Sequence, residues 1–355
     1  MNFTKNSIAF AVMMAIAGGA AMAQDKEKPK AQKPIPVPAV KADAAPKVDG
    51  SADDAVWKNA PVVKLEAVKG VNFKGNQGNT NGTVQLAYTA DTLYMLITYD
   101  DPTFSVKHSP YVKKADGKWE MVKDPADKGN DDTKFHGDKV SVMWNINDSI
   151  FGFSDKFSCT SVCHGGEKGK PYGNKYSEEA EEIADVWVMR YSQGGALGYG
   201  DDKYVDNTKF DPAKSPDAGR KSDPSTGGGY EKIKLVGGKP EFMAKDAKPA
   251  NKGGTYWVKA EDKVAFDDSK FKAGDEVASV IVAPFKGDRG DVAVGAKWAG
   301  GKWTVEFARK LKTGSKHDID LSDMGKTYAF GIGFFDNAEM RHAYVQAPLH
   351  LKFQK

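Results

Sequence analysis

Short runs in which apolar and polar residues alternate dominate this chain. In TVQLAYTADTLYMLITYDD, Val84, Leu86 and Tyr88 occupy every second position, and the alternation resumes at Leu93 after a turn at Ala90. A period of two residues is that of a β-strand with one buried face. The pattern therefore predicts a β-hairpin in this segment.

The same period predicts strands along the rest of the chain. In DKVSVMWNI, Val140, Val142 and Trp144 share one face of a strand, and Met143 lies on the other. Further strands are expected within residues 276–285, 292–311 (a hairpin turning at Gly300 and Gly301), 327–336 and 342–353. Long helical periodicity is almost absent. Many short strands with Gly-rich turns favour a mainly β fold, a β-sandwich with short helices.

Three segments depart from this alternation. Residues 177–192, SEEAEEIADVWVMRYS, predict a short helix, because Ser177 is a favourable N-cap and glutamates follow it. Residues 107–136 and 207–254 are polar and rich in Gly, Lys and Asp, which predicts two long loop insertions.

The N-terminus has the features of an export signal. Residues 1–23 contain Lys5, an apolar stretch and an Ala-Met-Ala cleavage site, which predicts a secretory signal peptide and a periplasmic location. Residues 24–46 are rich in Lys, Pro and Ala and are expected to form a disordered linker. One folded domain then extends over residues 47–355, with Trp57 as an early core residue.

Composition narrows the classes of partner. Apolar residues make up 40% of the chain, which is enough to build a core. The 51 basic and 48 acidic residues nearly balance, so charge gives no argument for nucleic acid or a membrane surface as a partner. After the signal peptide, no segment approaches the ~18 continuous apolar residues of a transmembrane helix.

Candidate chemistry is concentrated in FSCTSVCHGG. Cys159 and Cys163 are the only two cysteines among 355 residues, and His164 follows them directly. The usual attachment signature for c-type haem is C-x-x-C-H, in which two thiols add to the porphyrin vinyl groups and the adjacent histidine binds the iron. One extra residue keeps both thiols within reach of the vinyl groups. The motif therefore predicts one covalent haem c, with His164 as the proximal ligand.

Two other interpretations of the cysteines stay open. In an oxidising compartment, two cysteines four positions apart can form a local disulfide, although this leaves His164 without a role. A zinc site is less favoured, because the chain has no second Cys/His pair.

A low-spin c-type haem needs a second axial ligand. His108, His136 and His317 lie in polar stretches and are expected to be exposed to solvent, whereas His342 lies in the last strand segment. Met143 lies on the second face of its strand, and both faces are expected to be buried only if an apolar group such as a porphyrin covers one of them. His342 is the expected distal ligand, and Met143 is the alternative.

The chain resembles a known family from residue 47 to its C-terminus. The segments that carry the resemblance are VDGSADDAVWKNAP, VQLAYTADTLYMLITYDD, GDKVSVMWNINDSIFGF, CTSVCH, IADVWVMRYSQGGALGYGDDKYVD, GKWTVEFARKL and YAFGIGFFDNAEMRHAY. They resemble the cytochrome c-552/dimethyl-sulfoxide-reductase-like haem-binding domains, the group that includes the γ subunit of ethylbenzene dehydrogenase. The resemblance implies an immunoglobulin-like or DOMON-like β-sandwich with the haem held between its sheets.

The sequence also departs from this group. Its γ subunits hold a b-type haem with methionine and lysine as axial ligands. This chain instead carries two thiols for covalent attachment, and it reads MRHAY where the lysine is expected. The resemblance makes Met143 the counterpart of the methionine and His342 a replacement for the lysine.

The expected function is electron transfer rather than catalysis, because six-coordinate iron has no open position for a substrate. The resemblance implies a redox partner, either a periplasmic molybdenum oxidoreductase of which this chain is the haem subunit or another periplasmic cytochrome. A haem protein that senses a ligand at a vacant sixth position is a further hypothesis.

The alternative from another class is a haem-free carbohydrate-binding β-sandwich module with a structural disulfide. Aromatic side chains on a sandwich face can stack on sugars. The candidate platforms are Trp57, Trp187, Trp257, Trp298 and Trp303.

Overall fold

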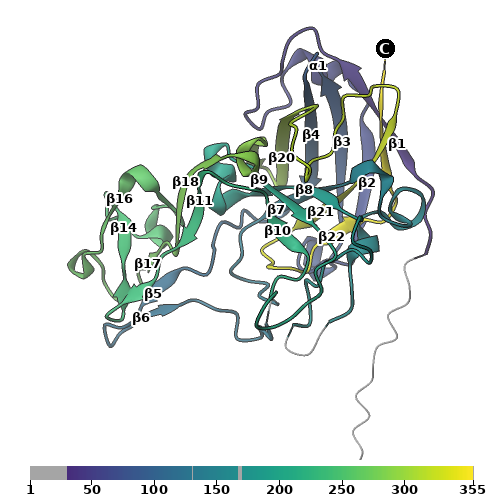
Figure 1. Ribbon diagram of the computed structural model, residues 1–355. Helices are drawn as coiled ribbons and strands as arrows, with labels where there is room; N and C mark the ends of the chain where they lie inside the picture. Colours follow the sequence, from purple (N-terminus) through teal and green to yellow (C-terminus); the bar gives the residue numbers. More distant parts are fainter. Residues whose placement is uncertain (1–29, 130, 167–169, 355) are drawn as a thin grey trace, which may run out of the picture.

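The computed structural model describes residues 30–129, 131–166 and 170–354. Figure 1 shows a large β-sandwich with a smaller lobe of short strands beside it. The expected signal peptide, residues 1–23, lies outside the described residues. Within the described ranges, no helix has both the length and the apolar character needed to span a membrane.

The sandwich consists of two layers joined into one hydrogen-bonded system of thirteen strands. The first layer contains β10 (Arg220–Ser222), β9 (Asp201–Val205), β8 (Ala184–Arg190), β7 (Lys139–Asn145) and β21 (Thr327–Phe335). The second contains β2 (Val63–Val68), β3 (Thr80–Tyr88), β4 (Thr92–Asp100), β20 (Lys302–Lys310) and β19 (Ala293–Ala299). Strands β22 (Ala343–Val345), β23 (Leu349–Phe353) and β1 (Ile35–Lys41) connect the layers. The predicted β-sandwich is confirmed.

The hairpins expected from the alternating pattern are present. Strands β3 and β4 pair antiparallel with Leu86 opposite Met95. Strands β19 and β20 pair around Gly300 and Gly301, both of which have positive φ, as a tight turn requires. Strand β7 runs through Met143 as predicted.

Large aromatic side chains fill the space between the two layers. Trp144, Trp187 and Trp303 are fully buried, and the Trp144 and Trp187 ring centroids lie 5.1 Å apart. Tyr99 of the second layer stacks on Phe334 of the first at 4.6 Å. The expected position of the haem, between the two sheets, is therefore wrong, because packed side chains occupy this space.

The helix predicted over residues 177–192 is wrong. The second half of this segment forms β8. Ser177 stabilises a turn instead of capping a helix, because its hydroxyl donates a hydrogen bond to the Glu182 carbonyl at 2.7 Å. Six of the seven β8 residues are buried, since the strand is covered on both faces. Burial on both faces removes the alternation that identifies a strand in sequence.

The linker predicted over residues 24–46 is also wrong in part. Residues Ile35–Lys41 form β1, which runs parallel to both β23 and β3. Val37 and Ala39 are completely buried in the sandwich core. The prolines are compatible with this strand because their backbone conformation is extended. The proline-rich composition predicted a linker and therefore gave no signal of the strand.

The two predicted loop insertions, 107–136 and 207–254, build the small lobe together with residues 255–286 (Figure 1). Its core contains Trp119, Phe271 and Ile281. Its strands are β5 (Tyr111–Lys113), β6 (Trp119–Met121), β11 (Gly227–Lys232), β12 (Leu235–Val236), β13 (Lys239–Pro240), β14 (Phe242–Ala244), β15 (Val258–Lys259), β16 (Lys263–Ala265), β17 (Glu276–Val277) and β18 (Val280–Lys286). The polar composition predicted loops, yet Trp119 of the first insertion and Ile233 and Met243 of the second join the core of the lobe.

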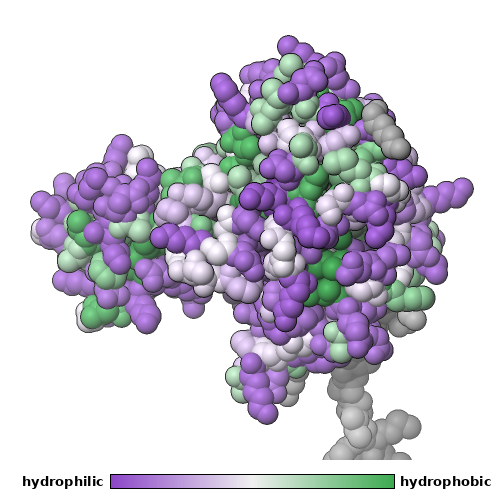
Figure 2. All heavy atoms as spheres, turned by 45° about the horizontal axis from the view of Figure 1, so that its top comes forward, coloured by the Kyte–Doolittle hydropathy of each residue, from purple (hydrophilic) through white to green (hydrophobic). Residues whose placement is uncertain are grey.

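Helical structure within the described ranges is short. The single α-helix, α1 (Ala55–Asn59), buries Trp57, whose indole N–H donates to Glu306 at 2.9 Å. The other helical turns are η1 (Lys74–Asn76), η2 (Ile146–Asp148), η3 (Phe153–Phe157), η4 (Ser158–Val162), η5 (Tyr191–Gln193), η6 (Gly195–Leu197), η7 (Ala250–Lys252), η8 (Ala260–Asp262), η9 (Asp268–Lys270) and η10 (Asp288–Gly290). Figure 2 shows a mostly hydrophilic surface over both lobes.

Removal of β1 tests its role in the core. A mature chain that begins at Ala42 should unfold at least ~5 °C below a matched chain that begins at Ala31, because burial of a valine such as Val37 alone stabilises a fold by roughly 1.5–3 kcal/mol. Circular dichroism during heating measures the difference. Equal unfolding temperatures would show that β1 adds nothing to the fold.

Candidate functional site

A cavity of about 870 Å³ lies on the outer face of the first layer. Met143 on β7 lies opposite Gly331 of β21 and Val186 of β8, so these residues share one face. Ser141 is placed in the same way between Gly333 and Val188. All six residues line the cavity, whose floor is therefore the face of the sheet that points away from the aromatic core.

Two glycines of β21 allow other segments to lie directly on this floor. A Cβ atom on Gly331 would come within 2.5 Å of the Ser158 hydroxyl and 2.9 Å of the Cys159 Cβ. A Cβ on Gly333 would come within 2.6 Å of the His342 Cδ2. Both distances are too short for any side chain, so the GIG sequence of β21 is required for Cys159 and His342 to pack here.

The loop between β7 and β8 positions the two cysteines differently. Cys159 is 5% exposed and packs with Met143 and Val162. Burial raises the pKa of the Cys159 thiol to about 11. Cys163 is exposed, and its Sγ lies 2.7 Å from the Lys175 Nζ. Both thiols are unbridged and both border the cavity, so they are available for reaction with a bound group.

His164 borders the same cavity but its ring is engaged elsewhere. The imidazole stacks on Tyr176 with the centroids 3.5 Å apart, and its Nε2 lies 2.8 Å from the Tyr176 carbonyl oxygen. Its Nδ1 lies 3.6 Å from the Glu178 carboxylate. In this arrangement neither ring nitrogen is directed at a ligand in the cavity.

His342 is held in a form suited to metal binding. Its Nδ1 lies 2.8 Å from the Met340 carbonyl oxygen, which can accept only from a protonated Nδ1. The lone pair then resides on Nε2, over Gly333, where no described residue hydrogen-bonds to it. Burial, with Lys175 as a lesser cause, lowers the pKa of His342 to about 3, so the imidazole stays neutral at physiological pH.

Met143 is buried by protein side chains. It is 5% exposed and packs in a cluster with Phe153, Cys159 and Val186. The expectation that this face needs a porphyrin to cover it is wrong, because the loop before Cys163 covers much of it. Met143 nevertheless borders the cavity next to Cys159.

A pair of histidines that the sequence pattern did not connect also lies at the cavity. His108 and His136 are half-buried, border the cavity, and pack edge to face with centroids 4.9 Å apart. Burial lowers the pKa of His108 to about 3 and lowers that of His136 further. His317 is also half-buried and stacks on Tyr204 at 4.0 Å. The expected solvent exposure of all three is wrong, and their polar sequence context gave no signal of it.

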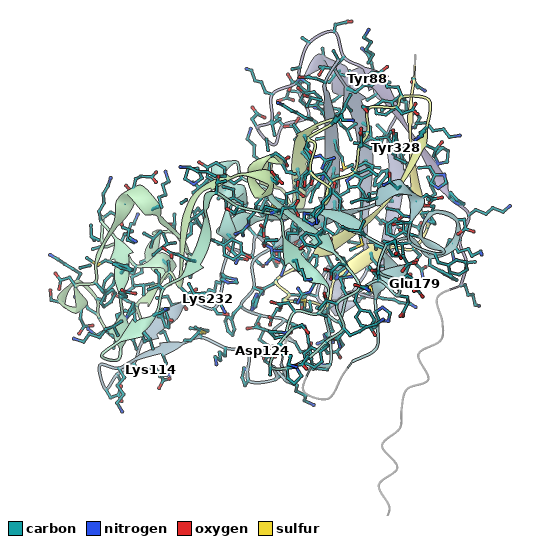
Figure 3. The ribbon with its side chains drawn as sticks, in the orientation of Figure 1. Tyr88, Lys114, Asp124, Glu179, Lys232 and Tyr328 are labelled. Carbon is teal, nitrogen blue, oxygen red and sulfur yellow. The ribbon has the colours of Figure 1, made fainter. Side chains whose placement is uncertain are left out.

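Positive charge surrounds the apolar floor. The Lys and Arg side chains that line the cavity are Lys69, Lys139, Lys175, Arg190, Lys203, Arg220, Lys232 and Arg341. Only two carboxylates, Asp217 and Glu339, line it with them. One of the lysines, Lys232, comes from β11 of the small lobe, where Figure 3 labels it. An apolar floor with cationic walls suits a flat apolar ligand that carries anionic groups.

The tryptophans proposed as sugar platforms are mostly in the core. Trp57, Trp187 and Trp303 are at most 4% exposed. Trp257 and Trp298 are half-buried, and Trp298 donates its indole N–H to the Asp101 carbonyl at 2.9 Å. None of the five lines the cavity.

Substitution of Gly331 tests the close packing of the cysteine loop. Gly331→Ala should lower the free energy of unfolding by about 1–3 kcal/mol, because Cys159 and its neighbours must move off β21. Urea unfolding followed by tryptophan fluorescence measures the change. The control is Gly325→Ala, at an exposed position where the nearest atom to the new Cβ is the Asp323 Oδ1 at 3.2 Å. Equal effects of the two substitutions would contradict the packing argument.

Comparison with known proteins places the chain in a family. Among solved structures, a carbohydrate binding module family 9 from Caldicellulosiruptor kristjanssonii in complex with cellotriose is similar over 90% of this chain and 95% of that chain, at 11% identity and a TM-score of 0.34. A putative carbohydrate-binding protein from Bacteroides uniformis is similar over 91% and 99%, at 8% identity and a TM-score of 0.33. Such low scores say nothing about ligands. No curated protein matches the sequence. Residues 54–347 match the family described as Ethylbenzene dehydrogenase, and the chain therefore belongs to that family.

Proposed function

We propose that the protein is an exported c-type cytochrome, not an enzyme in itself, that carries electrons through one haem c attached in the outer-face cavity. The observation that carries this proposal is the convergence of Cys159, Cys163, His164, Met143 and His342 on one cavity. Both cysteines of the chain are among them. Two thiols beside nitrogen and sulfur ligands are the donor set that covalent haem attachment requires.

The character of the cavity supports a haem as its ligand. Val186, Val188 and Met143 give it an apolar floor, which suits a porphyrin face. The lysines and arginines around that floor suit the two propionates, because charge-assisted hydrogen bonds to carboxylates are strong. The volume of about 870 Å³ falls within the roughly 300–1,000 Å³ of known ligand pockets. Cys159 on the floor and Cys163 at the edge would hold the group through two thioether bonds.

His164 and His342 are the proposed axial ligands. His342 already presents a neutral Nε2 to which none of the described residues hydrogen-bonds. For His164 to bind iron, its Nε2 must leave the Tyr176 carbonyl and its ring must leave the Tyr176 face. Met143 stays the alternative, because it lies on the floor beside Cys159 and needs no such change.

A haem with two axial protein ligands supplies one-electron transfer between ferric and ferrous iron. The protein would tune this chemistry through the lysines and arginines that surround the site. We propose that its partner is a periplasmic molybdenum oxidoreductase, for which it serves as the haem subunit, or another periplasmic cytochrome. Membership of the ethylbenzene dehydrogenase family supports the first of these.

Haem extraction tests covalent attachment. Protein exported from a host with haem-ligation machinery should show a Soret band, and the haem should stay with the protein in acidified acetone. The Cys159→Ala/Cys163→Ala variant should release its haem under the same treatment, because both thioethers are gone. Exported wild-type protein without a Soret band would overturn the proposal and favour the carbohydrate-binding module.

Spectra of ligand variants test the axial pair. His342→Ala should give a high-spin haem that binds carbon monoxide rapidly, whereas Met143→Leu should stay low-spin, because only the first removes a ligand. Magnetic circular dichroism reports both states. Loss of a methionine-to-iron charge-transfer band in Met143→Leu alone would instead identify the methionine as the distal ligand. Rapid carbon monoxide binding by the wild-type protein would favour a ligand sensor.

A further inference from the structure

A separate group of buried carboxylates lies where the edges of the two layers meet. Asp202 belongs to β9, and Asp223 follows β10 in the first layer. Asp291 precedes β19, and Asp318 follows β20 in the second layer. None of these four aspartates lines the outer-face cavity. The group is therefore distinct from the haem cavity.

The carboxylate oxygens of this group are close together. One oxygen each from Asp202, Asp291 and Asp318 lie within 4.8 Å of one another. Ca²⁺ binds oxygen ligands at about 2.3–2.6 Å, so two oxygens on opposite sides of one ion lie ~5 Å apart. The spacing of the three aspartates thus fits a single bound ion.

A fourth aspartate points to a ligand independently of this cluster. Asp223 is 3% exposed, and neither of its carboxylate oxygens has a hydrogen-bond partner. The Asp318 carboxylate lies beside it. One oxygen of each of Asp202, Asp291 and Asp318 is likewise unpaired. Buried polar atoms in folded proteins nearly always have partners, so these five unpaired oxygens require one.

The positive charge near these aspartates is too small to neutralise them. Arg309 is fully buried, and its Nη1 lies 2.9 Å from Asp185 and 3.3 Å from Asp318. Among the described residues, no salt bridge involves Asp202, Asp223 or Asp291. Five aspartates around one guanidinium leave an excess of buried negative charge, which is costly unless protons or a cation neutralise it.

We propose that Asp202, Asp223, Asp291 and Asp318 bind a calcium ion. All candidate ligands are carboxylates, which excludes the thiol- and imidazole-preferring metals and favours a hard cation. Three protein carboxylates within 4.8 Å of one another, with Asp223 beside Asp318 as a fourth, favour Ca²⁺ over Mg²⁺, which usually keeps several waters and binds only one or two carboxylates. The half-buried Asp291 leaves a route for the ion. The inference does not depend on the proposed haem.

The ion would tie the edge of the first layer, β9 and β10, to β19 and β20 of the second. Strand β9 also supplies Lys203 and Val205 to the cavity. Bound calcium would therefore hold β9, which forms one wall of the outer-face cavity, in position.

Thermal unfolding of the mature protein, freed of metal by a chelator, tests the proposal. Calcium at ~100 times its Kd should raise the unfolding temperature by roughly 5 °C. In the Asp202→Asn/Asp223→Asn variant this rise should disappear. Without calcium, the variant should be at least as stable as the wild type, because two buried like charges are gone. The comparison variant is Asp101→Asn, from a second group of clustered buried carboxylates (Asp101, Asp138 and Asp336), and it should retain the rise if the ion is bound at Asp202, Asp291 and Asp318.

Three results would overturn the proposed calcium site. The first is no effect of calcium on the wild type, which would indicate that protons neutralise the cluster. The second is an unchanged calcium effect in the double variant, and the third is its loss in Asp101→Asn alone. Should the double variant not fold, Asp291→Asn at the half-buried position replaces it, and equilibrium dialysis measures calcium bound to wild-type protein. Fewer than one ion per chain would equally overturn the proposal.

Discussion

The cavity depends on direct packing against β21. Gly331 and Gly333 lack side chains at the positions where Cys159 and the His342 ring lie on the strand. Any larger residue would separate these segments from the sheet. Because the two positions alternate along β21, both point to the outer face, while Phe330 and Ile332 point into the aromatic core. One strand thus closes the core on one side and supports the candidate site on the other.

Covering the outer face changes the chemistry of the groups on it. The loop between β7 and β8 and the segment around His342 bury a surface that would otherwise be solvated. Burial then lowers the pKa of His108 and His342 and raises the pKa of Cys159. The histidines are held neutral, which is the state in which imidazole binds metal ions. The same covering explains why β8 is apolar on both faces.

The charges of the protein are distributed unevenly despite their near balance overall. Lysines and arginines gather around the outer cavity, whereas unpaired aspartates gather at the edge where the layers meet. Strand β9 separates the two, with Lys203 on one face and Asp202 on the other. Neither concentration is visible in composition, because the contributing residues come from segments that are far apart in sequence.

The sequence by itself determined the strands in which apolar residues alternate with others, and it singled out Cys159, Cys163 and His164 as candidate site residues. Strands β3, β4, β7, β19, β20 and β21 follow from alternation, which records which side of a strand meets the core. Tertiary structure alone decided that residues 184–190 are a strand, since pairing with β7 and β9 overrides local helix signals. It also decided that Ile35–Lys41 joins the sheet, that the polar insertions share a core, and that His108 and His136 meet His342 at one cavity. These features depend on contacts between distant segments, and local sequence patterns contain no record of such contacts.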